Sequence, residues 1–170
     1  MQAIEAMLCD GANPSFLLAD SGSNTNAIIV AASSGDEECL SLLLSAPCAN
    51  PDAIDSRGGT ALMSAIYTSL PCVAILSKTS NVNIKNTNGE NALMLAVKYG
   101  SLGCVKILAP LVNLKDTNAK GLNVHCLARI ASTLWPEGEA ILLLLAALAE
   151  SEVLDQACGN AQPRAKSQRL

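Results

Sequence analysis

The residue types that could form a nucleophile and its base meet at one place in this chain. The single histidine, His125, directly precedes Cys126, and cysteine–histidine pairs support nucleophilic catalysis in other proteins. Adjacent residues on a helix point about 100° apart, so these two side chains do not face each other as an activated pair. The sequence therefore favours a partly buried structural histidine over a catalytic one.

Cysteines are the second group with possible chemistry. There are seven, and no two are spaced as C-x-x-C; they are Cys9, Cys39, Cys48, Cys72, Cys104, Cys126 and Cys158. Structural zinc sites usually take their ligands from such close pairs, and only one histidine is present to complete a mixed site. We expect reduced thiols that behave as small apolar residues, and no metal.

Signals for a cofactor or a catalytic carboxylate are also weak. The chain contains neither G-x-x-x-x-G-K-[ST] nor a G-x-G-x-x-G after a strand. Asp36, Glu37 and Glu38 form an acidic cluster at the predicted start of a helix, where carboxylates interact favourably with the helix dipole. We therefore expect no enzymatic activity, no catalytic residues and no cofactor.

The amino-acid composition limits the classes of partner that the chain is expected to bind. Half of the 170 residues are hydrophobic, 2% are aromatic and 15% are charged, with a net charge of −4. Leu and Ala dominate the apolar residues and favour helices, while the acidic balance argues against nucleic acid and against a polybasic membrane anchor. The acidic start is unlike a secretory signal, and the longest apolar run, 140–149, is too short to span a membrane. We expect a cytoplasmic protein in which this run forms a buried helix.

Internal repeats in the sequence indicate which structural elements position these residues. Val82–Asn88 recurs as Val112–Asn118, Ser69–Leu76 as Ser101–Leu108, and Ala61–Met63 as Ala92–Met94, at offsets of 30, 32 and 31 residues. One small-residue position recurs as Ala31, Ala65, Ala96 and Ala128. Three separate segments with nearly one period indicate a repeat protein.

One unit, residues 82–114, shows the local structure. Residues 86–89 form an Asn/Gly turn, Asn91 can cap a helix over 92–99, and Gly100 can end it. A mostly apolar second helix follows over 103–108, and Pro110 helps to stop it. Each unit is therefore predicted to be a turn, a helix, a short turn and a second helix.

Residues 55–65 (DSRGGTALMSA) and 86–96 (NTNGENALMLA) resemble the opening of the ankyrin repeat, D-x-x-G-x-T-P-L-H-x-A. The resemblance covers about residues 1–149 and implies an all-α ankyrin-repeat solenoid of helix–turn–helix units joined by Gly/Asn-rich finger loops. The motif histidine is replaced by Ile29, Met63, Met94 and Cys126, and its threonine survives only as Thr60. We expect these changes to weaken the polar network between each turn and its first helix.

We divide the chain into a partial repeat, 1–18, and four full repeats, 19–50, 51–81, 82–114 and 115–149. Residues 150–158 are a possible capping helix, in which Val153 and Leu154 pack on the apolar end of the array, and 159–170 are a disordered tail. The second full repeat is one residue short between Ala65 and Tyr67, and the last repeat has its insertion around Ala119 and Lys120. The partial first repeat lacks a first helix, so we expect either a fragment of a longer array or a chain whose upstream residues are absent here.

The resemblance implies binding of another protein on the concave face formed by finger loops and first helices. The family's contact positions fall on Ser56, Arg57, Gly59, Tyr67, Thr87, Asn88, Glu90, Lys98, Tyr99 and Lys120. The alternative is a regulatory or targeting ankyrin segment of a larger polypeptide, for example one with a kinase domain. Either way, we expect a monomer that binds neither nucleic acid nor membrane.

Two geometric expectations follow from stacked repeats. Cys39, Cys72 and Cys104 occupy equivalent places in three second helices, about 8–10 Å apart, so they should be buried and unbridged. Tyr67 and Tyr99 end adjacent first helices, and their rings should lie roughly 10 Å apart on one face. The pair is either a docking site or a structural cover over the groove between repeats.

Overall fold

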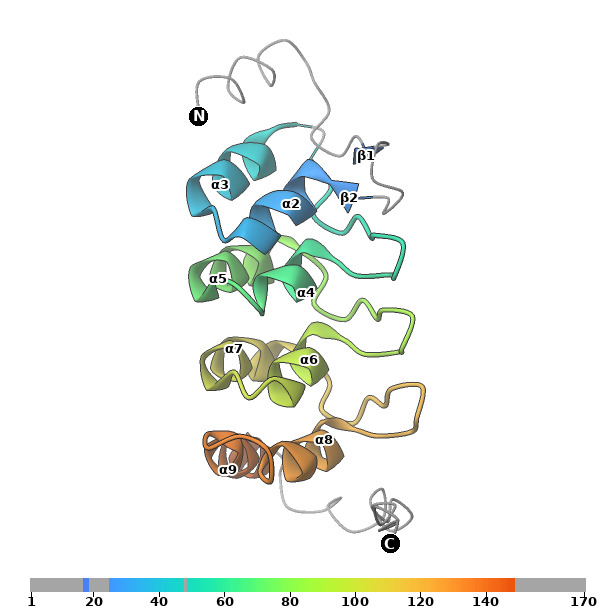
Figure 1. Ribbon diagram of the computed structural model, residues 1–170, viewed down its shortest axis with the longest axis vertical. Helices are drawn as coiled ribbons and strands as arrows, with labels where there is room; N and C mark the ends of the chain where they lie inside the picture. The colour runs from blue at the N-terminus through green and yellow to red at the C-terminus, as the bar shows by residue number, and fades with distance from the viewer. Residues whose placement is uncertain (1–16, 19–24, 48, 149–170) are drawn as a thin grey trace, which may run out of the picture.

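The computed structural model describes residues 17–18, 25–47 and 49–148, and these form stacked helix pairs (Figure 1). The first helices are α2 (Ala27–Ser34), α4 (Ala61–Ala65), α6 (Ala92–Lys98) and α8 (Val124–Ala131). The second helices are α3 (Glu37–Ser45), α5 (Leu70–Thr79), α7 (Leu102–Leu108) with the 3₁₀ turn η2 (Ala109–Leu111), and α9 (Gly138–Leu148). Two short strands, β1 (Leu17–Leu18) and β2 (Thr25–Asn26), pair antiparallel. The first and second helices stack in two parallel columns, and loops project on the side of the first helices.

Every first helix begins in the same way. The side-chain oxygen of the residue before the helix accepts a hydrogen bond from the backbone N–H three residues on, at 2.8–3.3 Å. The four capping residues are Asn26, Thr60, Asn91 and Asn123. Asparagine therefore retains the capping role of the motif threonine. The amide Nδ2 atoms of Asn26 and Asn91, by contrast, are buried and find no partner in the described part of the chain.

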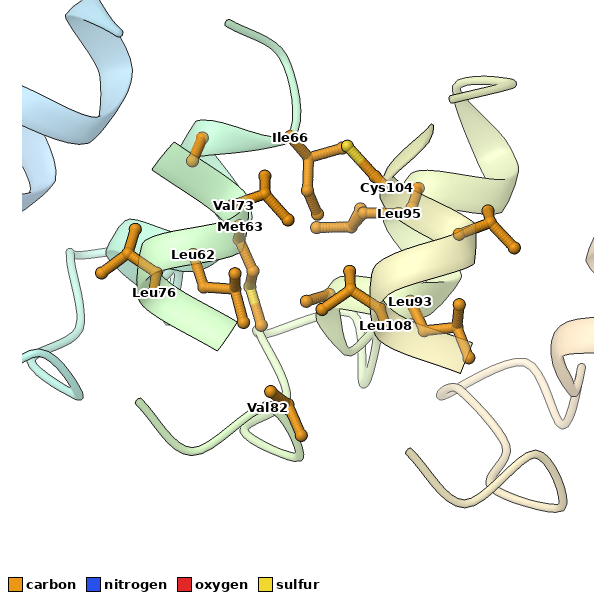
Figure 2. Packing of buried hydrophobic residues seen from close by; sticks show 14 of the residues in the cluster. Leu62, Met63, Ile66, Val73, Leu76, Val82, Leu93, Leu95, Cys104 and Leu108 are labelled. Carbon is orange, nitrogen blue, oxygen red and sulfur yellow. The ribbon is translucent and has the colours of Figure 1, made fainter. Parts of the chain in front are cut away.

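One apolar core runs through the array. One core cluster contains Leu62 and Leu76 from α4 and α5 together with Leu93 and Leu108 from α6 and α7, and Figure 2 shows this part of it. These four leucines are at most 1% exposed. Truncating a buried leucine to alanine typically costs about 2–5 kcal/mol of stability. The core is therefore continuous from one helix pair to the next.

Helix α9 departs from the expected burial. Ile141 and Leu145 are fully buried, but Leu143 is 71% exposed and Leu148 is 44% exposed. Among the described elements α9 contacts α7, α8 and η2, and these do not bury it all round as expected. The expected capping helix and tail, 150–170, lie outside the described residues, as does the partial repeat 1–18 apart from β1.

The thiols follow the spacing argument only in part. Cys39, Cys72 and Cys104 are free, as predicted, and the last two are buried. Cys39 is only half-buried, since among the described second helices α3 has a neighbour, α5, on one side only. Cys126 is disulfide-bonded, which corrects the expectation of seven reduced thiols. It lies on a first helix, α8, to which the spacing argument did not apply.

Candidate functional site

Three finger loops, 55–59, 86–90 and 118–122, share one set of hydrogen bonds. In the first, the Asp55 carboxylate accepts from the backbone N–H groups of Arg57 at 2.8 Å and Gly59 at 2.7 Å. The side-chain oxygens of Asn86 and Asn118 accept from the corresponding N–H groups of their own loops at 2.9–3.0 Å. The glycines at the turns, Gly58, Gly89 and Gly121, have φ of 70–73°. The sequence therefore builds the same rigid turn three times.

Backbone hydrogen bonds join neighbouring fingers. The Thr87 N–H donates to the Arg57 carbonyl, and the Ala119 N–H donates to the Asn88 carbonyl, each at 3.0 Å. A Cβ on Gly89 would lie 2.6 Å from the Ala119 nitrogen, so the fingers approach too closely for a side chain there. Arg57, Asn88 and Lys120 consequently occupy equivalent places along one row. We call these three residues the finger-tip row.

This register corrects the position of the insertion in the last repeat. Asn118 takes the structural role of Asn86, 32 residues earlier, whereas Val112 matches Val82 at an offset of 30. The two extra residues therefore lie between Leu114 and Asn118 rather than around Ala119 and Lys120. Lys85 contacts this inserted stretch through the Asp116 carboxylate at 3.2 Å and the Thr117 carbonyl. Lys120 is thereby a regular finger-tip residue.

Tyr67 and Tyr99 touch each other at the ends of α4 and α6. Their ring centroids are 4.7 Å apart with an interplanar angle of 69°, an edge-to-face arrangement. The expected separation of 10 Å is wrong because it describes the spacing of helix axes, whereas these long side chains lean together. The rings remain 54% and 43% exposed. Partial burial, together with the Tyr99 hydroxyl, raises the pKa of Tyr67 above its usual value.

An ion pair flanks the tyrosines. The Lys98 ammonium lies 3.0 and 3.3 Å from the two Glu90 carboxylate oxygens, and 6.0 Å from the centroid of the Tyr99 ring. Glu90 is only 6% exposed, and Lys98 compensates its charge. Its carboxylate is therefore not free to bind a ligand. The carboxylate holds the lysine stem beside the ring. Cationic contact with an aromatic face contributes about 0.5–1 kcal/mol at exposed sites.

The predicted site residues thus form two groups. The structure brings together Tyr67, Tyr99, Lys98 and Glu90, from α4, α6 and the finger before α6. The finger residues Ser56, Arg57, Thr87, Asn88 and Lys120 are exposed along the stacked loops, and Gly59 is half-buried. Among these predicted site residues, Glu90 alone is buried, and its carboxylate is already paired with Lys98.

Trp135 was not among the predicted site residues. It follows α8, which is the first helix of the last repeat. Its indole Nε1–H donates to the Lys98 carbonyl at 3.0 Å. Its ring covers Gly100, where a Cβ would lie 2.7 Å from the tryptophan Cγ. Two features of the sequence could have indicated it. Trp135 is the only tryptophan, and it follows the first helix of the last repeat, which is the repeat with the extra residues.

His125 behaves as the structural interpretation predicted. It lies on α8, is 9% exposed, and burial lowers the pKa of its imidazole. Its Nδ1 finds no partner within the described ranges. Those ranges also hold no cluster of three His, Cys, Asp or Glu residues suited to a metal ion. Within them, no helix has the length and apolar character needed to cross a membrane.

Comparison with known families agrees with this architecture. A model described as ankyrin repeats in three copies matches residues 2–86, and one described as ankyrin repeats in many copies matches residues 75–124. No curated protein matches the chain. The helix pairs, the recurring fingers and the two family matches confirm the predicted α-solenoid. The chain belongs to the ankyrin-repeat family.

Proposed function

We propose that this chain is a non-catalytic, monomeric module that binds another protein on its concave face. This face comprises the finger-tip row (Arg57, Asn88, Lys120) and the tyrosine cluster (Tyr67, Tyr99, Lys98). Ankyrin repeats generally serve as protein–protein interaction modules, which supports the binding class. Fingers and first helices lie on one side of the second-helix column (Figure 1) and supply the surface. We place the module in the cytoplasm.

The exposed tyrosine pair carries this proposal. Tyrosine is enriched at interface hot spots because its ring offers a large apolar area with a polar tip. Here two rings form one continuous apolar surface of which about half is open to solvent. Their mutual contact fixes the rings before a partner arrives, which lowers the entropy cost of binding. A mixed-charge rim around such a centre sets orientation more than affinity.

The test is a quantitative pull-down from native cells with the intact chain and the double variant Tyr67→Ala/Tyr99→Ala. Loss of hot-spot side chains should cost about 2 kcal/mol or more of binding free energy. Leu111→Ala is the matched control, because Leu111 is 48% exposed but lies in η2, after a second helix. Circular dichroism checks that both variants fold.

A protein that is retained by the intact chain and by Leu111→Ala but lost by the double variant would support the proposal. Equal retention by all three, or loss only in Leu111→Ala, would move the binding surface away from the tyrosines.

A further inference from the structure

Positive charge is concentrated in one part of a chain that is acidic overall. Residues 57–129 contain eight Lys and Arg residues but only two acids, Glu90 and Asp116, against a net charge of −4 for the whole chain. Of the described acids before it, Asp52 and Asp55 lie in the same repeat as Arg57, while Asp36 caps α3 and Glu37 and Glu38 occupy its first turn. The middle of the array therefore differs in sign from the chain as a whole.

Both acids in this region are already neutralised. Glu90 pairs with Lys98 at 3.0 Å, and Asp116 pairs with Lys85 at 3.2 Å. The Asp55 carboxylate, beside the first finger tip, is engaged by the backbone N–H groups of its own loop. Among the carboxylates of the described fingers, Glu90 and Asp116 are therefore paired with lysines, whereas Asp55 keeps its charge and its Oδ1 atom accepts both backbone hydrogen bonds.

Two cations on the same face remain uncompensated. Arg57 and Lys120 are exposed finger-tip residues, and neither forms an ion pair within the part of the chain that the structure describes. They occupy equivalent positions on either side of the neutral Asn88, because the fingers are joined by backbone hydrogen bonds. An apolar centre, the tyrosine pair, lies at the ends of α4 and α6, which the fingers of Arg57 and Asn88 precede.

We propose that the concave face takes an acidic peptide segment of its partner, with an apolar or aromatic side chain on the Tyr67–Tyr99 pair and carboxylates toward Arg57 and Lys120. This inference rests on the proposed function and specifies the partner's chemistry. Complementary charge raises the association rate and selects against basic partners. A nucleic acid fits less well, since its affinity depends on neutralising many phosphates and only two free cations lie on this row.

The experiment selects binders from a random peptide library displayed on phage, with the intact chain as bait. We expect Asp and Glu to be enriched around an aromatic or large aliphatic residue. Selected peptides are then labelled, and their affinities are measured by fluorescence anisotropy at about 50 mM salt, where exposed charges are weakly screened. Arg57→Glu/Lys120→Glu should weaken binding about tenfold or more.

The matched control is Lys78→Glu/Lys106→Glu. It changes the net charge by the same amount, but both lysines are exposed on the second helices α5 and α7. Binding to this control should stay within about twofold of the intact chain. Equal weakening in both charge variants would show a general charge effect and overturn the proposal.

A third variant, Tyr67→Ala/Tyr99→Ala, separates the two proposals. Selected peptides without acidic enrichment that still require the tyrosines would overturn the acidic partner and leave the binding module standing. Peptides that ignore the tyrosines would overturn both. A single-stranded oligonucleotide is the remaining probe: binding that Arg57→Glu/Lys120→Glu abolishes, in the absence of acidic peptides, would assign the row to nucleic acid instead.

Discussion

Two neighbouring junctions between repeats have aromatic rings at the ends of their first helices. The rings make different contacts at the two junctions. Between the second and third full repeats, Tyr67 and Tyr99 contact each other edge to face. Between the third and fourth, Trp135 lies over Gly100 and its indole donates to the Lys98 carbonyl. Tyr99 and Trp135 are both 43% exposed. Exposure therefore does not distinguish the two junctions.

The difference lies in what each ring holds in place. Trp135 satisfies a backbone carbonyl of the preceding repeat and fills the space left by a glycine, so its removal disrupts the stacking. The tyrosine rings mainly contact each other, with the Lys98 ammonium nearby. Their loss leaves the backbone hydrogen bonds of both helices intact. We infer that the tryptophan junction is structural and that the tyrosine junction is available to a partner.

The largest effect on stability is expected at the tryptophan junction. Gly100→Ala combines a left-handed backbone, φ 70°, with a Cβ 2.7 Å from the Trp135 Cγ, so the ring must move. We expect a loss of about 3 kcal/mol, of which about 1–2 kcal/mol is the backbone cost. Urea unfolding measures it.

Gly121→Ala is the matched control for that measurement. Gly121 has nearly the same φ, 73°, but no atom lies within 4 Å of the added Cβ. This variant should lose only the backbone part, about 1–2 kcal/mol. Equal losses at both glycines would show that Trp135 does not constrain the junction.

A smaller effect isolates the indole hydrogen bond. Trp135→Phe retains an aromatic ring over Gly100 but removes the donor to the Lys98 carbonyl. The loss should be about 1 kcal/mol of unfolding free energy, the usual net contribution of one hydrogen bond. Partner binding should not change. A variant that binds less but unfolds normally would move Trp135 into the binding surface.

The smallest effect is a pH dependence at the terminal repeat. Burial lowers the pKa of His125, so the folded chain favours the neutral imidazole more than the unfolded chain does. The unfolded state therefore binds the proton more readily, and stability falls as pH drops below about 6.5, the ordinary histidine pKa.

Replacing the imidazole tests this directly. Leu62 and Leu93 occupy the equivalent position in earlier repeats, two residues after the capping side chain, so His125→Leu should fit. Urea unfolding at pH 7 and pH 5.5 should show a larger drop for the intact chain than for the variant. Identical drops would mean that other groups cause the dependence.

The regular part of the molecule was predictable from sequence, and the contacts between repeats were not. The capping of α6 by Asn91 and the turn at Gly89 depend on residues within a few positions of each other. The Tyr67–Tyr99 separation and the Trp135 contact depend on how side chains lean across repeats, which periodicity does not encode. The predicted position of the insertion was wrong because the sequence of Val112–Asn118 resembles that of Val82–Asn88. In the structure, however, Asn118 takes the role of Asn86 rather than that of Asn88.

Photo-crosslinking in cells tests the central claim, that the concave face is the contact surface. A photoreactive amino acid replaces Thr87 or Asn88 on a finger, or, as controls, Ser41 on α3 or Lys78 on α5; all four side chains are exposed. The account predicts crosslinked adducts from the finger positions and none from the controls. Adducts from Ser41 or Lys78, with none from the fingers, would contradict it.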